Sequence, residues 1–137
     1  MIERTFAMIK PDAVRHGHTG KVIDRIEREG FVILGLEKQQ LTRQKAEELY
    51  AIHRERSFFG EMLVSITASP LIVMVLEKEG AIKAWRDLMG ATNPAQAESD
   101  TLRKLFGVSI GENAVHGSDS PESAKTEINI FFPQLAR

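Results

Sequence analysis

An uninterrupted apolar run constrains the fold of this chain more than any other feature. Residues 71–76 carry no polar side chain, and a run of this length suits a β-strand better than a helix. Because no polar position alternates along it, Leu71–Leu76 is predicted to be a central strand that is buried on both faces of a sheet. The run is far shorter than the ~20 residues of a membrane-spanning helix, so we expect no membrane partner.

The composition excludes several classes of protein. The 137 residues include 18 Lys or Arg against 19 Asp or Glu, which argues against a strongly basic nucleic-acid-binding protein, and no specific nucleic-acid partner is expected. There is no cysteine, so disulfides, thiolate metal sites and a cysteine nucleophile are absent. The length predicts one domain over residues 1–137. The first residues lack the pattern of a signal peptide, so we expect a cytoplasmic protein.

Predicted strands and helices alternate along the chain. Further strands are expected at 5–9, at 31–36 and, in a short segment, at 114–115. Helices are expected at 20–28, 42–54, 58–67, 81–89 and from Ser120-Pro121 onward, with a turn-rich stretch between 91 and 117. This order favours an α+β, ferredoxin-like (split βαβ) fold: an antiparallel sheet with helices on its faces and an inserted loop or helical region.

Of the four histidines, His116 has the most informative surroundings. It follows the strand-like Ala114-Val115 and precedes a helix start, and such strand-to-helix turns suit anionic ligands. A neutral imidazole is nucleophilic near pH 7. Glu127, in the following helix, could hydrogen-bond one ring nitrogen and leave the other free to attack. The pattern leaves a second interpretation open, a turn histidine that is satisfied by its neighbours.

Glycine-rich phosphate-binding loops are missing. Neither GxxxxGK[ST] nor GxGxxG is present, so side chains would have to hold the phosphates of a nucleotide. Lys10, Arg86 and Arg103 lie near the ends of predicted elements and could do so. A residue of this kind, taken alone, is more often a solvated surface charge.

Four ordered sequence blocks carry a resemblance to a known family. They are residues 3–12, 50–59, 86–94 and 113–120, and the last contains the pattern Asn-x-x-His-Gly-Ser-Asp. In their order and spacing they resemble the nucleoside diphosphate kinases over residues 3–132. The resemblance implies an enzyme that moves the γ-phosphoryl group of a nucleoside triphosphate to a nucleoside diphosphate by a ping-pong route.

The matching positions imply catalytic roles. His116 would be the nucleophile and would form a phosphohistidine through Nδ1. Glu127 and Ser118 would orient its other nitrogen. Tyr50 would lie beside the histidine and the phosphate, and Lys10 would lie near the transferred group.

The resemblance also implies how a nucleotide would bind. The phosphate oxygens would be held by Arg86, Thr92 and Arg103. The sugar hydroxyls would be reached by Lys10 and Asn113, and the base would stack on Phe58. No protein metal ligand is implied, since Mg²⁺ would be bound mainly through the nucleotide phosphates. The residues at these nucleotide-binding positions are Lys10, Phe58, Arg86, Thr92, Arg103 and Asn113.

The resemblance also implies an oligomeric assembly. The family forms homo-oligomers, and retention of the block at 92–94 favours a hexamer over a tetramer. Four residues depart from the usual family residues, which points to an effect on turnover, stability or assembly: Ser57, Lys78, Asp100 and Leu105.

One alternative function is that of a nucleotide-binding regulatory relative with reduced or lost transfer. A ferredoxin-like nucleic-acid binder is another, but it would need exposed aromatic residues interleaved with basic ones.

Overall fold

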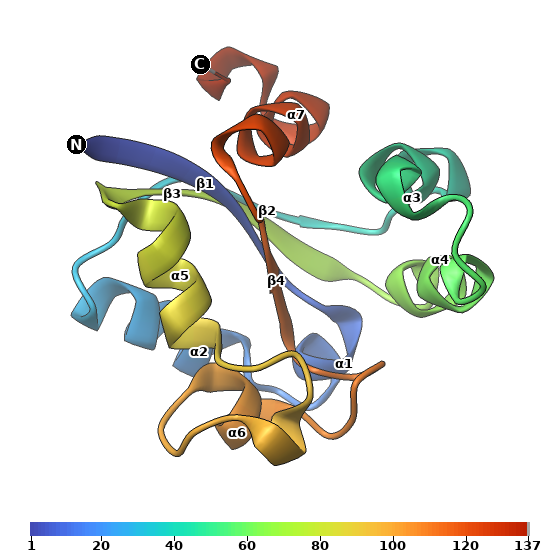
Figure 1. Ribbon diagram of the computed structural model, residues 1–137, viewed down its shortest axis with the longest axis horizontal. Helices are drawn as coiled ribbons and strands as arrows, with labels where there is room; N and C mark the ends of the chain where they lie inside the picture. Colours follow the sequence, from blue (N-terminus) through green and yellow to red (C-terminus); the bar gives the residue numbers. More distant parts are fainter. Residues whose placement is uncertain (137) are drawn as a thin grey trace.

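A four-stranded antiparallel sheet forms the centre of residues 1–136, the part of the chain that this computed structural model describes (Figure 1). Its strands are β1 (Ile2–Ile9), β2 (Val32–Gln39), β3 (Leu71–Glu79) and β4 (Val115–Gly117), in the order β2-β3-β1-β4. β3 pairs with both β1 and β2, which confirms the predicted central strand. β4 is short and pairs only with the end of β1.

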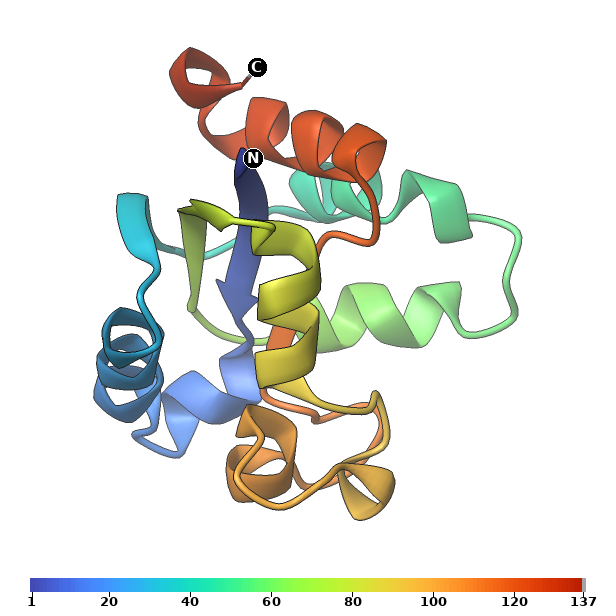
Figure 2. The same cartoon turned by 60° about the vertical axis from the view of Figure 1, so that its left-hand side comes forward.

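The side chains of β3 alternate between two apolar cores. Ile72, Met74 and Leu76 face a core that includes residues of α2 (Thr19–Arg28) and α5 (Ala81–Met89). The intervening residues face a second core, which is covered by α3 (Arg43–Leu49), α4 (Phe59–Thr67) and α7 (Pro121–Phe131). Helices therefore cover both faces of the sheet (Figure 2), and the α+β, ferredoxin-like prediction is confirmed.

Two helices begin with the capping residues that the sequence predicts. The Thr42 hydroxyl accepts a hydrogen bond from the Lys45 amide at the start of α3. Ser120 and Ser123 form a reciprocal capping box at the start of α7, where Pro121 takes the first helical position. These caps fix where the two helices begin.

The predicted helix over 42–54 is wrong in its extent. α3 ends at Leu49, and a separate 3-10 turn, η1 (Ala51–His53), follows it. The backbone leaves the helical region at Tyr50, with φ −102° and ψ 20°, and then tightens. The tighter turn places the rings of Tyr50 and His53 6.1 Å apart.

The sequence prediction also missed two five-residue helices, α1 (Pro11–Arg15) and α6 (Leu102–Phe106), and two 3-10 turns, η2 (Pro94–Gln96) and η3 (Pro133–Leu135). α1 and α6 lie close together at one end of the sheet (Figure 2). Both are too short to show an apolar period in the sequence. Between residues 1 and 136, no helix is long and apolar enough to cross a membrane.

Two departures from the usual family residues make specific contacts. Asp100 has a positive φ of 72°, a conformation that favours glycine, and its carboxylate pairs with Arg25 of α2 at 3.2 Å. The Lys78 ammonium lies 5.6 Å from the centre of the Phe31 ring. Leu105 is half exposed on α6, and Ser57 is exposed before α4.

The indole of Trp85 packs directly against the backbone of Gly117. A β-carbon on Gly117 would overlap the Trp85 ring and would press on the Met89 methyl group. Trp85 is fully buried, so its ring has nowhere to move. Gly117 is therefore required by close approach rather than by its backbone angle.

We expect Gly117→Ala to lower the free energy of unfolding by about 1–3 kcal/mol, because the added methyl group overpacks the core. Denaturant unfolding measures this change. Gly60→Ala is the matched control, since nothing lies within 4 Å of the added carbon in α4, and its stability should be unchanged or higher. Equal midpoints for the two variants would contradict the packing argument.

Candidate active site

His116 lies in the middle of β4, and the surrounding structure fixes its backbone. β-sheet pairing places it opposite Met8, and its carbonyl accepts a hydrogen bond from the Trp85 indole at 3.1 Å. The imidazole lies edge-on to the rings of Phe6 and Tyr50, at 6.3 and 6.0 Å between centres. Its side chain keeps 23% exposure, so a ligand can reach it.

A carboxylate faces one nitrogen of this imidazole. Glu127 Oε1 lies 3.6 Å from His116 Nε2, slightly beyond hydrogen-bond distance. The same oxygen accepts a 2.7 Å hydrogen bond from the buried Ser118 hydroxyl. The expected grouping of these three residues is present, although Nε2 is buried and has no hydrogen-bond partner among residues 1–136.

Lys10 and Asn113 meet beside the start of β4. The Lys10 ammonium donates to the Asn113 side-chain oxygen at 2.9 Å, and the Asn113 amide donates to the Thr92 carbonyl at 3.0 Å. Burial lowers the pKa of Lys10 and nearby Arg103 lowers it further, while Asp12 and Glu112 oppose the shift. Three of the predicted nucleotide-binding residues are thus joined by hydrogen bonds.

Arg103 is largely buried and holds two backbone segments together. Its two terminal nitrogens donate to the carbonyls of Gly90 and Val115, both at 3.0 Å. Its Nε is buried without a partner among the described residues. Burial, with a smaller contribution from Arg86, lowers the pKa of Arg103 to about 10, so the group stays protonated near neutral pH.

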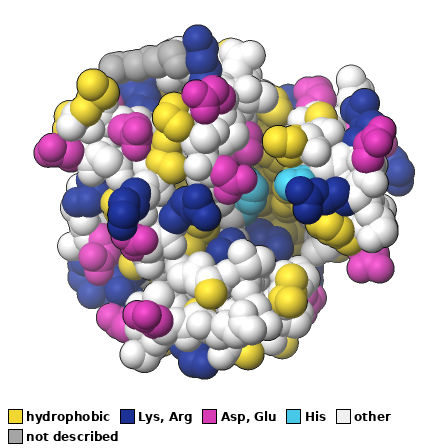
Figure 3. Space-filling view, in the orientation of Figure 1, with side chains coloured by type: hydrophobic (Ala, Val, Ile, Leu, Met, Phe, Trp, Pro, Cys, Tyr) yellow, Lys and Arg dark blue, Asp and Glu magenta, His cyan; other side chains and the backbone are white. Residues whose placement is uncertain are grey.

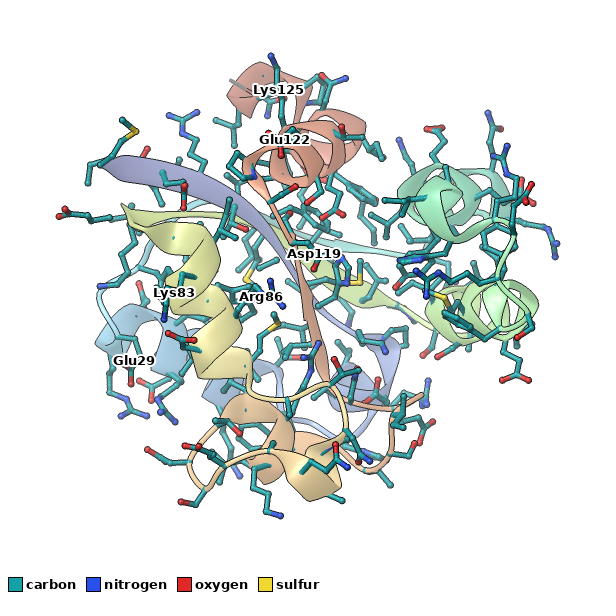
Figure 4. The ribbon with its side chains drawn as sticks, viewed as in Figure 1. Glu29, Lys83, Arg86, Asp119, Glu122 and Lys125 are labelled. Atoms are coloured by element: carbon teal, nitrogen blue, oxygen red, sulfur yellow. The ribbon has the colours of Figure 1, made fainter. Side chains whose placement is uncertain are left out.

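A wide cleft of about 840 Å³ is lined by residues of α5, by the loop that follows it, by Arg103 of α6 and by Asp119, three residues after His116. Figure 3 shows the hollow near the centre of this face, with histidine, lysine and arginine side chains gathered around it. Arg86 and Asp119 both line the cleft and are labelled near the centre of the same view in Figure 4. Its lining includes three of the predicted phosphate-binding residues, Arg86, Thr92 and Arg103.

A row of rings leads from the imidazole to the molecular surface. The ring centre of Tyr50 lies 6.1 Å from that of His53, which lies 6.2 Å from that of Phe58. Phe58 is 41% exposed and is available for stacking, whereas Tyr50 is buried. Burial, together with the charge of Glu127, raises the pKa of Tyr50 well above its usual range, so its hydroxyl stays protonated.

The donor set does not form a metal cage. Between residues 1 and 136, no group of three or more histidine, aspartate or glutamate side chains is placed to hold a metal ion.

Sequence reasoning missed three residues of this region. Trp85 was expected only in the core, but it also holds the His116 backbone. His53 was expected on a helix, but it lies between Tyr50 and Phe58. Asp12 was given no role, although it is buried against the start of β4. No sequence signal marks this contact, because the partner of Asp12 is a backbone amide 102 positions away.

A ferredoxin-like fold that places an imidazole beside a carboxylate, with an arginine bound to the carbonyl of the preceding residue, is the arrangement expected of a histidine-dependent phosphotransferase. The family model described as "Nucleoside diphosphate kinase" matches residues 3–136. With 98% of both chains covered, the chain is 60% identical to the nucleoside diphosphate kinase of Geotalea uraniireducens and 55% identical to that of Geobacter sulfurreducens. It belongs to the nucleoside diphosphate kinase family.

Solved structures agree with this assignment. The Aquifex aeolicus nucleoside diphosphate kinase superposes with a TM-score of 0.97 at 42% identity, over 99% of both chains. The nucleoside diphosphate kinase of Halobacterium salinarum, solved in complex with CDP, superposes with a TM-score of 0.92 at 36% identity. That comparison covers 96% of this chain and 88% of the other.

We expect Arg103→Lys to lower the free energy of unfolding by about 1–3 kcal/mol, because lysine cannot reach both carbonyls and would leave one unpaired. Chemical denaturation measures the loss. Arg86→Lys is the matched control: Arg86 is exposed, so its stability should change by no more than about 0.5 kcal/mol. The bridging role would be wrong if Arg103→Lys were no less stable than the control.

Proposed function

We propose that this protein is an active nucleoside diphosphate kinase whose nucleophile is His116. The observation that carries the proposal is the position of the Glu127 carboxylate, which is held by Ser118 and lies 3.6 Å from Nε2 of the imidazole. A carboxylate at Nε2 favours a proton on that nitrogen and leaves the lone pair of Nδ1 for attack. The 3.6 Å separation is one that can tighten when substrate binds.

In the first half-reaction, Nδ1 of His116 attacks the γ-phosphorus of a nucleoside triphosphate. The bond between that phosphorus and the bridging β-oxygen breaks, the diphosphate leaves with the electron pair, and a phosphohistidine remains. In the second half-reaction, a terminal oxygen of another diphosphate attacks this phosphorus and the imidazole leaves. One site serves both nucleotides in turn.

Cationic side chains would neutralise the charge on the transferred group. Arg86 and Arg103 line the cleft, and Lys10 lies near enough to Arg103 for that charge to lower its pKa. Positioning plus charge neutralisation supplies most of the catalysis in phosphoryl transfer. Thr92 would bind a phosphate oxygen, and the buried Tyr50 hydroxyl would lie beside the phosphate as a neutral donor. Mg²⁺ would enter on the nucleotide, whose phosphates are its main ligands.

The sugar and the base would lie toward the surface. The Lys10–Asn113 pair would receive the sugar hydroxyls. The exposed ring of Phe58 would stack on the base, and stacking tolerates different bases because every base has a π-face. All the site residues that the family resemblance implies are present in this chain. A regulatory relative without transfer activity is therefore not favoured.

Incubation with γ-labelled ATP and Mg²⁺ should label the protein with an acid-labile, base-stable phosphate, because the bond formed is a phosphoramidate. A nucleoside diphosphate should then remove the label. His116→Ala should abolish labelling, whereas His16→Ala, in an exposed turn, should retain it. Wild-type protein that is folded but takes up no label would exclude the proposed activity.

We also propose that residues 1–137 work as one domain within a homohexamer. The block at Asn93-Pro94 that favours this assembly is well ordered: the Asn93 side chain caps η2, and the buried Pro94 packs against Gly107. Light scattering at working concentration should give the mass of six chains. A mass of four chains would show that the protein is a tetramer and that the proposed hexamer is wrong.

A further inference from the structure

The residue two positions before the proposed nucleophile has a strained backbone. Ala114 has φ +74°, a conformation that residues with a β-carbon rarely adopt. The amide of Val115 donates to the carbonyl of Asn113 at 2.9 Å, which closes a three-residue turn around Ala114. Turns of this hand are rare and strained, and they persist only where the surrounding structure holds them.

Two residues that follow β1, Lys10 and Asp12 of α1, hold both backbone groups of Ala114. The Lys10 amide donates to the Ala114 carbonyl at 2.8 Å, which extends the β1–β4 ladder by one pair. The Ala114 amide donates to Asp12 Oδ2 at 3.0 Å. Asp12 is 2% exposed and Ala114 is fully buried, so water cannot take the place of this carboxylate.

The turn at Ala114 connects two functional side chains. Asn113, on one side, contacts Lys10 and Thr92, and His116 follows two residues later on β4. If the turn relaxed toward negative φ, the direction of the chain would change between them, and both would move relative to a bound nucleotide. The structure therefore contains a reason for a buried carboxylate at position 12 that binding and chemistry do not use directly.

We propose that Asp12 is a positioning residue for phosphoryl transfer: its carboxylate clamps the strained turn at Ala114 and so sets the placement of His116 relative to Asn113. This inference rests on the proposed function of His116. Asp12 acts through the backbone and touches no substrate.

The Asp12 carboxylate could also act in a second way. Asp12 also opposes the lowering of the Lys10 pKa, so its charge could matter for Lys10 rather than for the turn. Substitutions separate the two explanations. Asp12→Asn keeps an oxygen that can accept from the Ala114 amide but removes the charge, whereas Asp12→Ala removes both. Ala114→Gly removes the strain, because glycine adopts positive φ readily.

The experiment measures the single-turnover rate of phosphohistidine formation and the steady-state kcat and KM, on protein shown to be folded. Asp12→Ala should lower the rate by about 10- to 100-fold, as expected for a misplaced nucleophile. Asp12→Asn should recover most of this loss, and Ala114→Gly in the Asp12→Ala background should recover part of it. Asp24→Ala, an exposed aspartate of α2, is the control and should match wild type.

Three results would overturn the proposal: an Asp12→Ala rate equal to wild type, an Asp12→Asn loss as large as that of Asp12→Ala, or no recovery in the double variant. If Asp12→Ala does not fold, Asp12→Asn and its double variant with Ala114→Gly carry the test, and a large loss that glycine does not relieve overturns it. Wild-type protein without any transfer would instead exclude the proposed function, so the two failures are distinguishable.

Discussion

The short pairing of β4 with β1 is the constraint on which the site depends. Three residue pairs join the two strands, from Ala7↔Gly117 to Ile9↔Val115, and one further backbone hydrogen bond, from Lys10 to Ala114, extends the ladder. Other groups reinforce this pairing, because the indole of Trp85 and the guanidinium of Arg103 bind carbonyls of β4. A three-residue strand would be marginal alone, and these contacts from two helices make it a fixed support for the imidazole.

The strands and the burial of the central one could be predicted from the sequence, apart from the exact strand ends. A six-residue apolar run favours a strand that is buried on both faces, and Leu71–Leu76 lies in such a strand. Short elements were not predictable in the same way. The five residues of α6 cover barely more than one helical turn, so no period exists to detect, and its cap at Thr101 lies in a turn-rich stretch.

The members of the site were predicted from family motifs, but their contacts were not. Sequence spacing cannot show that Arg103 donates to two backbone carbonyls, or that the Ser118 hydroxyl donates to the same Glu127 oxygen that faces His116. Asp12 could not be given a role from its spacing, because its partner is the amide of a residue 102 positions away. Long-range contacts to backbone groups leave no signature in the sequence.

The buried fork of Arg103 has a further consequence for affinity. A flexible surface arginine loses rotamer freedom when it takes hold of a phosphate, and that loss weakens binding. The backbone carbonyls of Gly90 and Val115 already immobilise Arg103 before any ligand arrives. Its ordering entropy is therefore part of folding rather than of each catalytic cycle, which suits a site that two different nucleotides must enter and leave in every turnover.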